Sequence, residues 1–264
     1  MKKFKSRLVS TSKKILKPFL PPILINLVKA IKNGCGYKHI YKNNFNILLE
    51  IEKSGAKFRK GSTDELVFNQ VYSGFCGLYP FKDAKIIIDA GANCGFSSIW
   101  FAKNFPDAKI FAIEPDFDNF SILSENVKKY SNIIPLNLAL TNQEGTVTIV
   151  DRGTGEWGYS VADDSITTLK IRNQIESTSI QSIMEKFSFS RIDILKVDVE
   201  GSETKIFDTS SVNWIEQCRV ITVEPHDYIA PNASRSIFYS IMKFPQFTCR
   251  AQGELFVFIN QSLK

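Results

Sequence analysis

One ten-residue stretch, residues 86–95, constrains the fold of this chain more than any other, because it joins an apolar run to a turn that contains glycine. Its three consecutive isoleucines are typical of a strand covered on both faces, as in a parallel α/β sheet. Gly91 and Gly95 allow a sharp bend and let a ligand approach the backbone. Apolar residues 99–101 then predict a helix that begins near Ser97. Ligands of open α/β sheets bind outside the carboxyl ends of the strands, so the turn predicts a ligand site.

The turn does not match the dinucleotide-binding pattern Gly-x-Gly-x-x-Gly, since Asn93 and Phe96 replace two of its glycines. Asp89 adds a negative charge, which would repel a phosphate but could accept hydrogen bonds from an ammonium group. A second strand, residues 109–113, leads into Glu114, whose carboxylate could bind two ribose hydroxyls. Asp89 and Glu114 together predict S-adenosylmethionine as the cofactor. The alternative, two ordinary carboxylates at strand ends, stays open.

A later predicted strand, residues 192–200, carries charge where a central parallel strand should be apolar. Burying such charges unpaired costs several kcal/mol, so they should be paired or face a cavity. Alternation places Lys196, Asp198 and Glu200 on one face, and we expect Lys196 to neutralise the two acids. Oxygen ligands suit hard cations, so Asp198, Glu200 and Glu224 could form a metal site. A site without a metal is the favoured hypothesis.

His226 is one of two histidines and follows the next predicted strand, residues 219–224. A neutral imidazole can take a proton from a hydroxyl near neutral pH. The hypothesis is that His226 acts as general base for methyl transfer, while Glu200 or Asp198 positions the acceptor. A purely structural role for this histidine is the alternative.

Seven segments in order resemble the FkbM family of S-adenosylmethionine-dependent methyltransferases, over about residues 61–264. The segments are 61–70, 87–95, 112–115, 137–140 with Gly145, 156–159, 193–203 and 223–227. Cys94, Ser202 and Pro225 depart from the family pattern without removing a charged position. The resemblance implies an α/β class I (Rossmann-like) fold, with a mostly parallel seven-stranded sheet covered by helices on both faces. Further expected elements are a helix at 117–129, strands at 132–139 and 146–150, and a final antiparallel pair at 247–250 and 254–259.

The resemblance and the patterns above also give a set of expected site residues. Those expected to bind the cofactor are Asp89, Gly91, Asn93, Gly95, Glu114, Pro115, Asn137, Ala139, Asp64 and Gln70. Those expected to contact the acceptor are Trp157, Tyr159, Lys196 and Glu224, and the catalytic set is His226, Glu200 and Asp198. A helix capped by Ser62 or Thr63 should cover the cofactor. Residues 153–160 are expected to form a wall or lid, with a plain surface hairpin as the alternative.

Charge divides the chain into a basic arm, residues 1–60, and an acidic domain, residues 61–264. The arm holds 15 Lys and Arg against two acids, a net charge of +13, and the remainder holds 18 against 25, a net charge of −7. Apolar residues recur at helical spacing from 15 to 31 among lysines, a pattern typical of a segment lying on an anionic membrane. The apolar run 18–28 is too short, and too rich in proline, to span a bilayer.

Peripheral membrane contact is therefore the favoured hypothesis for the arm, and packing on its own domain or on another protein is the alternative. Nucleic acid is not expected as a partner, because the arm has no recognisable binding motif. The apolar run has no cleavage site after it, which argues against a signal peptide. The five cysteines show no paired spacing, which favours a reducing cytoplasm, here at the inner face of the membrane.

The family context and the basic arm favour a sugar hydroxyl as acceptor, in a bacterial surface polysaccharide or its lipid-linked precursor. One rival hypothesis is a methyltransferase for another small molecule or a lipid. The other is a cofactor-binding interaction protein without turnover. The sequence does not indicate an oligomeric state.

Overall fold

The computed structural model describes residues 56–75, 77–162, 169–208 and 212–263. The predicted arm therefore lies outside the described residues except for its last five positions. Within the described residues, no helix is both long enough and apolar enough to cross a membrane.

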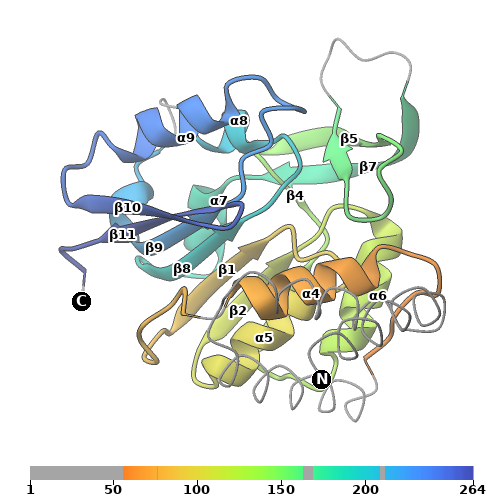
Figure 1. Cartoon of the computed structure of the whole chain (residues 1–264), viewed down its shortest axis with the longest axis horizontal. Coiled ribbons are helices and arrows are strands. Elements are labelled where there is room, and N and C mark those ends of the chain that lie inside the picture. Colours follow the sequence, from red (N-terminus) through yellow and green to blue (C-terminus); the bar gives the residue numbers. More distant parts are fainter. Residues whose placement is uncertain (1–55, 76, 163–168, 209–211, 264) are drawn as a thin grey trace, which may run out of the picture. The chain divides into compact units, whose positions relative to one another are not determined.

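A seven-stranded sheet forms the centre of the domain, in the order β10-β11-β9-β8-β1-β2-β3 (Figure 1). Its strands are β1 (Ile86–Ala90), β2 (Lys109–Ile113), β3 (Ile133–Leu136), β8 (Ile192–Val197), β9 (Cys218–Val223), β10 (Phe247–Gln252) and β11 (Leu255–Asn260). The first five run parallel, and β11 is antiparallel to both of its neighbours. The predicted class I fold, with its final antiparallel pair, is confirmed.

Helices cover both faces of this sheet, which explains why its central strands lack polar alternation (Figure 1). One face carries α4 (Asp64–Gly74), α5 (Phe96–Asn104) and α6 (Phe117–Val127). The other carries α7 (Ile180–Lys186), α8 (Glu203–Ile206) and α9 (Ala233–Ile241), and a short 3-10 helix, η1 (Ile215–Gln217), precedes β9. On β1, Ile88 and Ala90 belong to the core shared with α7–α9, so the pleat turns Ile87 and Asp89 toward the α4–α5 side.

A second, four-stranded sheet has the order β4-β7-β5-β6. Its strands are β4 (Ala139–Leu140), β5 (Gly145–Asp151), β6 (Tyr159–Val161) and β7 (Lys170–Thr178). The sequence predicted β5, and a loop or hairpin at β6, but not β7. Most of β7 is exposed or half-buried and its residues are largely polar, so it lacks the apolar pattern that would reveal a strand. Because β4 follows β3 directly, this sheet begins at the carboxyl edge of the central sheet.

Aromatic packing attaches α4 to the central layer. Phe68 lies edge-on to Phe96, the first residue of α5, and Phe75 lies edge-on to Trp100. Phe58, near the end of the predicted arm, stacks on Phe96 with ring centroids 4.7 Å apart. Residues 57–59 therefore pack against the domain, just before the boundary predicted at position 61.

The helix α5 begins at Phe96, near the predicted Ser97, whose hydroxyl donates to Asp89. One predicted element boundary needs correction. The strand β8 ends at Val197, short of the predicted Glu200. Glu200 has a φ of 49°, a left-handed conformation that ends the extended chain and costs about 1–3 kcal/mol.

Candidate active site

A pocket of about 710 Å³ lies at the carboxyl ends of β1, β2, β8 and β9, within the usual size range of ligand sites. Thirteen of the predicted site residues line it: Gln70, Gly91, Asn93, Glu114, Pro115, Ala139, Trp157, Tyr159, Lys196, Asp198, Glu200, Glu224 and His226. Four others, Asp64, Asp89, Gly95 and Asn137, do not form part of the lining. Residues from four strands and from α4 thus converge on one cavity.

The glycine turn after β1 needs its glycine at position 91 for steric reasons. Gly91 has a φ of 78°, and a Cβ built there would lie 1.7 Å from the carbonyl oxygen of Asp198. Real Cβ atoms do not approach so closely, so any side chain would push the turn away from the end of β8. Asn93, also left-handed with a φ of 50°, accepts a hydrogen bond from the backbone N–H of Cys94, and asparagine tolerates this conformation better than most residues.

Asp89 is fully buried beneath this turn rather than exposed to a ligand. It accepts hydrogen bonds of 2.6 Å from the hydroxyls of Ser97 and Ser98, and its other oxygen lies 3.4 Å from Nζ of Lys196. This geometry does not favour the direct contact between Asp89 and an ammonium group of the ligand that the sequence predicted. Asp89 instead holds Lys196, which donates to the carbonyl of Gly91 at 2.8 Å.

Glu114 lies where the ribose-binding carboxylate was predicted. Its two oxygens accept hydrogen bonds from the backbone N–H groups of Asn93 at 2.9 Å and Asp116 at 3.0 Å. Burial raises the pKa of Glu114 to about 7, although these hydrogen bonds favour the ionised form. The carboxylate faces the pocket and keeps lone pairs for hydroxyl donors. Its role toward ribose stays a prediction.

The segment before β6 is hydrogen-bonded to the turn after β1, to α6 and to the residue that precedes α4. The backbone carbonyl of Glu156 accepts from the amides of Asn93 at 3.0 Å and Asn119 at 2.8 Å. Its carboxylate accepts from the backbone N–H of Thr63. Trp157, which follows directly, lines the pocket. These bonds hold the segment along one side of the pocket, as expected for a wall. Nothing in the sequence indicated the hydrogen bond from Asn119.

Tyr159 is the second aromatic residue of this wall. The guanidinium of Arg172 on β7 lies 4.4 Å from the centre of its ring, close enough for a cation–π contact. Arg172 in turn pairs with Asp116, the residue that caps α6. The second sheet therefore fixes the ring of Tyr159 at the edge of the pocket.

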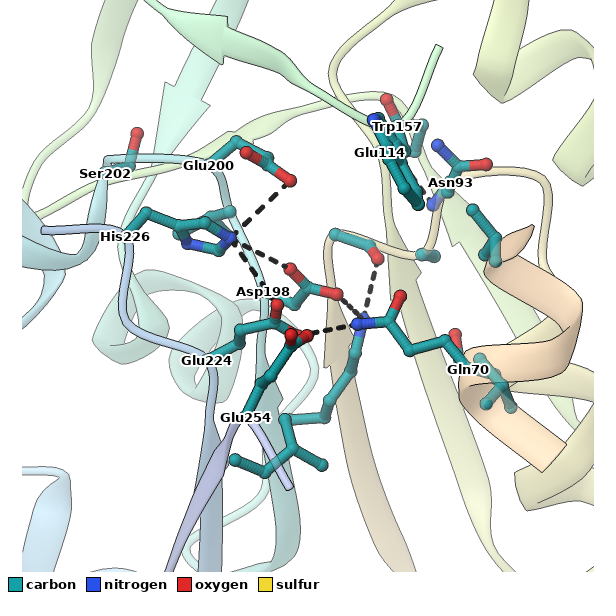
Figure 2. Close-up of a pocket in the computed structure, with 18 of the residues that line it drawn as sticks. Gln70, Asn93, Glu114, Trp157, Asp198, Glu200, Ser202, Glu224, His226 and Glu254 are labelled. Atoms are coloured by element: carbon teal, nitrogen blue, oxygen red, sulfur yellow. Dashed lines mark hydrogen bonds and ion pairs between the residues drawn. The ribbon is translucent and has the colours of Figure 1, made fainter. Parts of the chain in front are cut away.

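A cluster of carboxylates surrounds His226 at the other end of the lining (Figure 2). Nε2 of His226 lies 3.5 Å from Glu200, 3.8 Å from Asp198 and 4.0 Å from Glu224. Its Nδ1 lies 2.6 Å from Oε1 of Glu203, a buried residue that belongs to a predicted segment but was not predicted as a site residue. Gln70 donates to Glu224 at 3.0 Å and so joins α4 to the cluster.

The charges in this cluster set its protonation. Burial lowers the pKa of Lys196, but Asp198 and Asp89 raise it by more, so Lys196 stays charged. It pairs with Asp198 as predicted, but its second partner is Asp89 and not the predicted Glu200. Burial likewise lowers the pKa of His226, but the hydrogen bond to Glu203 and the charge of Glu200 raise it to about 9. An imidazolium cannot accept a proton, so this arrangement does not favour His226 as the general base.

Glu200 is better suited to accept a proton than His226 in this arrangement. Its side chain lines the pocket and is 17% exposed, so an acceptor can reach it. Burial raises its pKa to about 7, although the charge of His226 lowers it. Burial and the charge of Asp198 also raise the pKa of Glu224.

Three of the predicted residues that do not line the pocket contact or position residues next to it. Asp64 is fully buried and pairs with Arg59 at 2.7 Å, so it fixes the start of α4. Asn137 donates to the carbonyl of Glu114 at 2.8 Å. Gly95 packs toward α6, where an added Cβ would meet Leu123. These residues do not line the pocket, and their expected roles toward the cofactor stay predictions.

The strand order and the glycine turn between β1 and α5 define the class of the protein: a class I, Rossmann-like methyltransferase fold. The family model described as the methyltransferase FkbM domain matches residues 89–264. The chain belongs to the FkbM methyltransferase family, and its cofactor is S-adenosylmethionine. The residues present fit this cofactor in one further respect, because the carboxylate of Glu114 faces the pocket, where it could accept hydrogen bonds from ribose hydroxyls.

Individual methyltransferases are also similar to this chain, two of them in sequence and one as a solved structure. The chain is 22% identical over 192 residues to methyltransferase sdnD of Sordaria araneosa, covering 61% of this chain and 74% of that protein. It is 26% identical over 156 residues to the hexuronic acid methyltransferase AglP of Haloferax volcanii, covering 57% of this chain and 59% of that protein. An O-methyltransferase from Bacillus cereus, solved with SAH, has 11% identity and a TM-score of 0.42, covering 87% of this chain and 94% of that one.

Proposed function

We propose that the protein transfers a methyl group from S-adenosylmethionine to a hydroxyl oxygen. The observation that carries this proposal is the position of Asp198, Glu200 and Glu224 in the same pocket as the glycine turn. Carboxylates accept hydrogen bonds from hydroxyl groups and can also take up the proton that the acceptor must lose. A hydroxyl bound among them would lie in the same cavity that we propose for the cofactor.

In the proposed step the acceptor oxygen forms a bond to the methyl carbon as the carbon–sulfur bond breaks. The electron pair of that bond stays on sulfur, so the sulfonium becomes the neutral thioether of S-adenosylhomocysteine. The hydroxyl proton passes to the carboxylate of Glu200. The protein contributes mainly alignment, because the sulfonium is already activated.

The acceptor we propose is a sugar, in a bacterial surface polysaccharide or its lipid-linked precursor. The name of the relative AglP, a hexuronic acid methyltransferase, supports the choice of a sugar. The net charge of +13 over residues 1–60 supports contact with an anionic membrane, where a lipid-linked sugar would be found. Deletion of residues 1–33 should then move the protein from the membrane pellet to the supernatant, and an unchanged distribution would count against membrane contact.

Two measurements test the proposed function. Isothermal titration with S-adenosylhomocysteine should show binding, and its absence would remove both the proposed enzyme and the rival methyltransferase for a small molecule or lipid. Transfer of a labelled methyl group to host extracts should then label a polysaccharide or lipid-linked sugar fraction. Label confined to other small molecules or lipids would favour the rival enzyme. The absence of any label would favour a non-catalytic binding protein.

The role of Glu200 is tested by Glu200→Gln, which keeps the size of the side chain but removes its basicity. General base catalysis contributes about 10²–10⁴-fold, so kcat should fall by that order while S-adenosylhomocysteine still binds. Turnover within a few-fold of the wild type would assign the proton to another group.

A further inference from the structure

We infer that Asp198, Glu224 and His226 form a binding site for a divalent metal ion, and that the bound ion holds the oxygen of the acceptor hydroxyl. The three residues come from the ends of the neighbouring parallel strands β8 and β9. The presence of the site is independent of the methyl acceptor, whereas its role in the reaction rests on the proposed function.

The geometry of the three ligand atoms suits a metal ion. One oxygen of Asp198, one oxygen of Glu224 and one ring nitrogen of His226 all lie within 4.8 Å of one another. Nε2 of His226 is 3.8 Å from the oxygen of Asp198 and 4.0 Å from that of Glu224. A point equidistant from three atoms so spaced lies about 2.5 Å or less from each, close to the bond lengths of divalent ions with oxygen and nitrogen.

His226 gives a second indication, separate from the acidic residues. Only 2% of its side chain is exposed, and Nε2 points at the carboxylates of Glu200, Asp198 and Glu224, which lie 3.5–4.0 Å away (Figure 2). Its Nδ1 is held by Glu203, whose own side chain is fully buried. Metal-binding histidines are typically oriented in this way, with a carboxylate on the nitrogen that does not bind the metal.

The charge balance around this point also favours a cation. Four carboxylates of the lining gather here, from Asp198, Glu200, Glu224 and Glu254, beside the ammonium group of Lys196. Lys196 is already shared with the buried Asp89. A divalent ion bound to the neutral imidazole of His226 would add positive charge among these acids.

One nitrogen and two carboxylate ligands suit a first-row ion such as Mn²⁺ or Zn²⁺ better than Mg²⁺ or Ca²⁺, which prefer oxygen alone. The ion would leave positions open for the acceptor, since Asp198, Glu224 and His226 supply only three ligands. A hydroxyl bound to it ionises more readily, and its oxygen is held in place for attack on the methyl carbon. The proton and electron balance of the transfer stays as written for the proposed function.

Binding of Mn²⁺ to the full chain tests this site directly, without an acceptor. Electron paramagnetic resonance of protein without a histidine tag should show loss of free Mn²⁺ signal at one site per chain, and Zn²⁺ should compete. Asp198→Asn and Glu224→Gln should each weaken Mn²⁺ binding at least tenfold, and so should His226→Gln. Glu203→Gln should weaken it about 10–100-fold through the orientation of His226.

Asp107→Asn is the matched control, because Asp107 is 78% exposed and pairs with Lys85 in a surface ion pair. It should bind Mn²⁺ like the wild type. Titration with S-adenosylhomocysteine checks that each variant is folded, and the two carboxylate variants keep the test decisive if His226→Gln does not fold. Failure of the wild type to bind Mn²⁺ or Zn²⁺ below 1 mM, or equal binding by the variants, would overturn the inference. Specific metal binding without methyl transfer to any extract would instead overturn the proposed function alone.

Discussion

Replacement of Gly91 by alanine should separate the requirement for a left-handed backbone from the requirement for empty space. Gly91 has a φ of 78°, and a Cβ there would lie 1.7 Å from the carbonyl oxygen of Asp198. Gly153 offers a matched comparison, because its φ is 79° and nothing lies within 4 Å of an added Cβ. The two substitutions therefore share the same backbone penalty and differ in the clash.

The expected magnitudes follow from these two terms. A residue with a Cβ in the left-handed region costs about 1–2 kcal/mol, which is the whole expected effect of Gly153→Ala. In Gly91→Ala the turn or the end of β8 must also move by more than 1 Å. Overpacking of this kind adds about 1–3 kcal/mol. At about 2–4 °C per kcal/mol for a domain of this size, Gly91→Ala should melt about 2–12 °C below Gly153→Ala.

The shift in the turn should also weaken cofactor binding. The carbonyl of Gly91 accepts from Lys196, and the backbone of Asn93, two residues later, donates to Glu114. We expect the affinity of Gly91→Ala for S-adenosylhomocysteine to fall at least tenfold, and that of Gly153→Ala to stay within twofold of the wild type. Thermal unfolding and isothermal titration measure the two effects.

Equal melting temperatures for the two alanine variants would refute the steric argument, since only the backbone penalty would then operate. Wild-type affinity in Gly91→Ala would refute the second step, namely that the position of this turn governs cofactor binding. The two outcomes are independent, because stability and affinity are measured separately.

Two further predictions concern buried carboxylates. Burial raises the pKa of Glu114 to about 7, so its carboxyl group is mostly protonated at pH 6 and mostly ionised at pH 8. If the ionised form binds the ribose, the affinity for S-adenosylhomocysteine should rise about tenfold between these two pH values. Glu114→Gln should bind more weakly and lose that rise, and a pH dependence retained in the variant would assign it to another group. Asp64→Asn should destabilise the domain by about 1–3 kcal/mol in urea unfolding, because it leaves the half-buried Arg59 without its charged partner. Glu125→Gln, in an exposed ion pair with Lys57, should change stability by less than about 0.5 kcal/mol, and equal losses in the two would contradict the role of burial.

The strands of the central sheet were predictable because buried parallel strands leave continuous apolar runs. Residues 109–113 were predicted as a strand with the same bounds that β2 has in the structure. The strand β7 was not predictable in this way, since only its last residues are buried and its pattern is polar. Its pairing with β5 depends on contacts between distant segments that local sequence does not record.

In the candidate site, too, some features were predictable from the sequence and others were not. Charged residues after strands, such as Glu114, Asp198 and Glu224, were predictable because parallel strands bring their carboxyl ends to one edge of the sheet. Asp89 was also at a strand end, but Ser97 and Ser98 cover it, and burial decided its role.

The sequence by itself determined the buried central strands, the turn at residues 91–95 and the set of acids at the strand ends, because periodicity and strand-end position are local properties of the chain. The class I fold followed from the resemblance of its motifs to a known family. Only the tertiary structure decided what those acids can do. It placed Glu203 against Nδ1 of His226 and gathered the carboxylates around Nε2, and this raises the pKa of His226 to about 9. Charge and burial depend on neighbours brought together by folding, so the change of His226 from expected base to inferred metal ligand came from the structure.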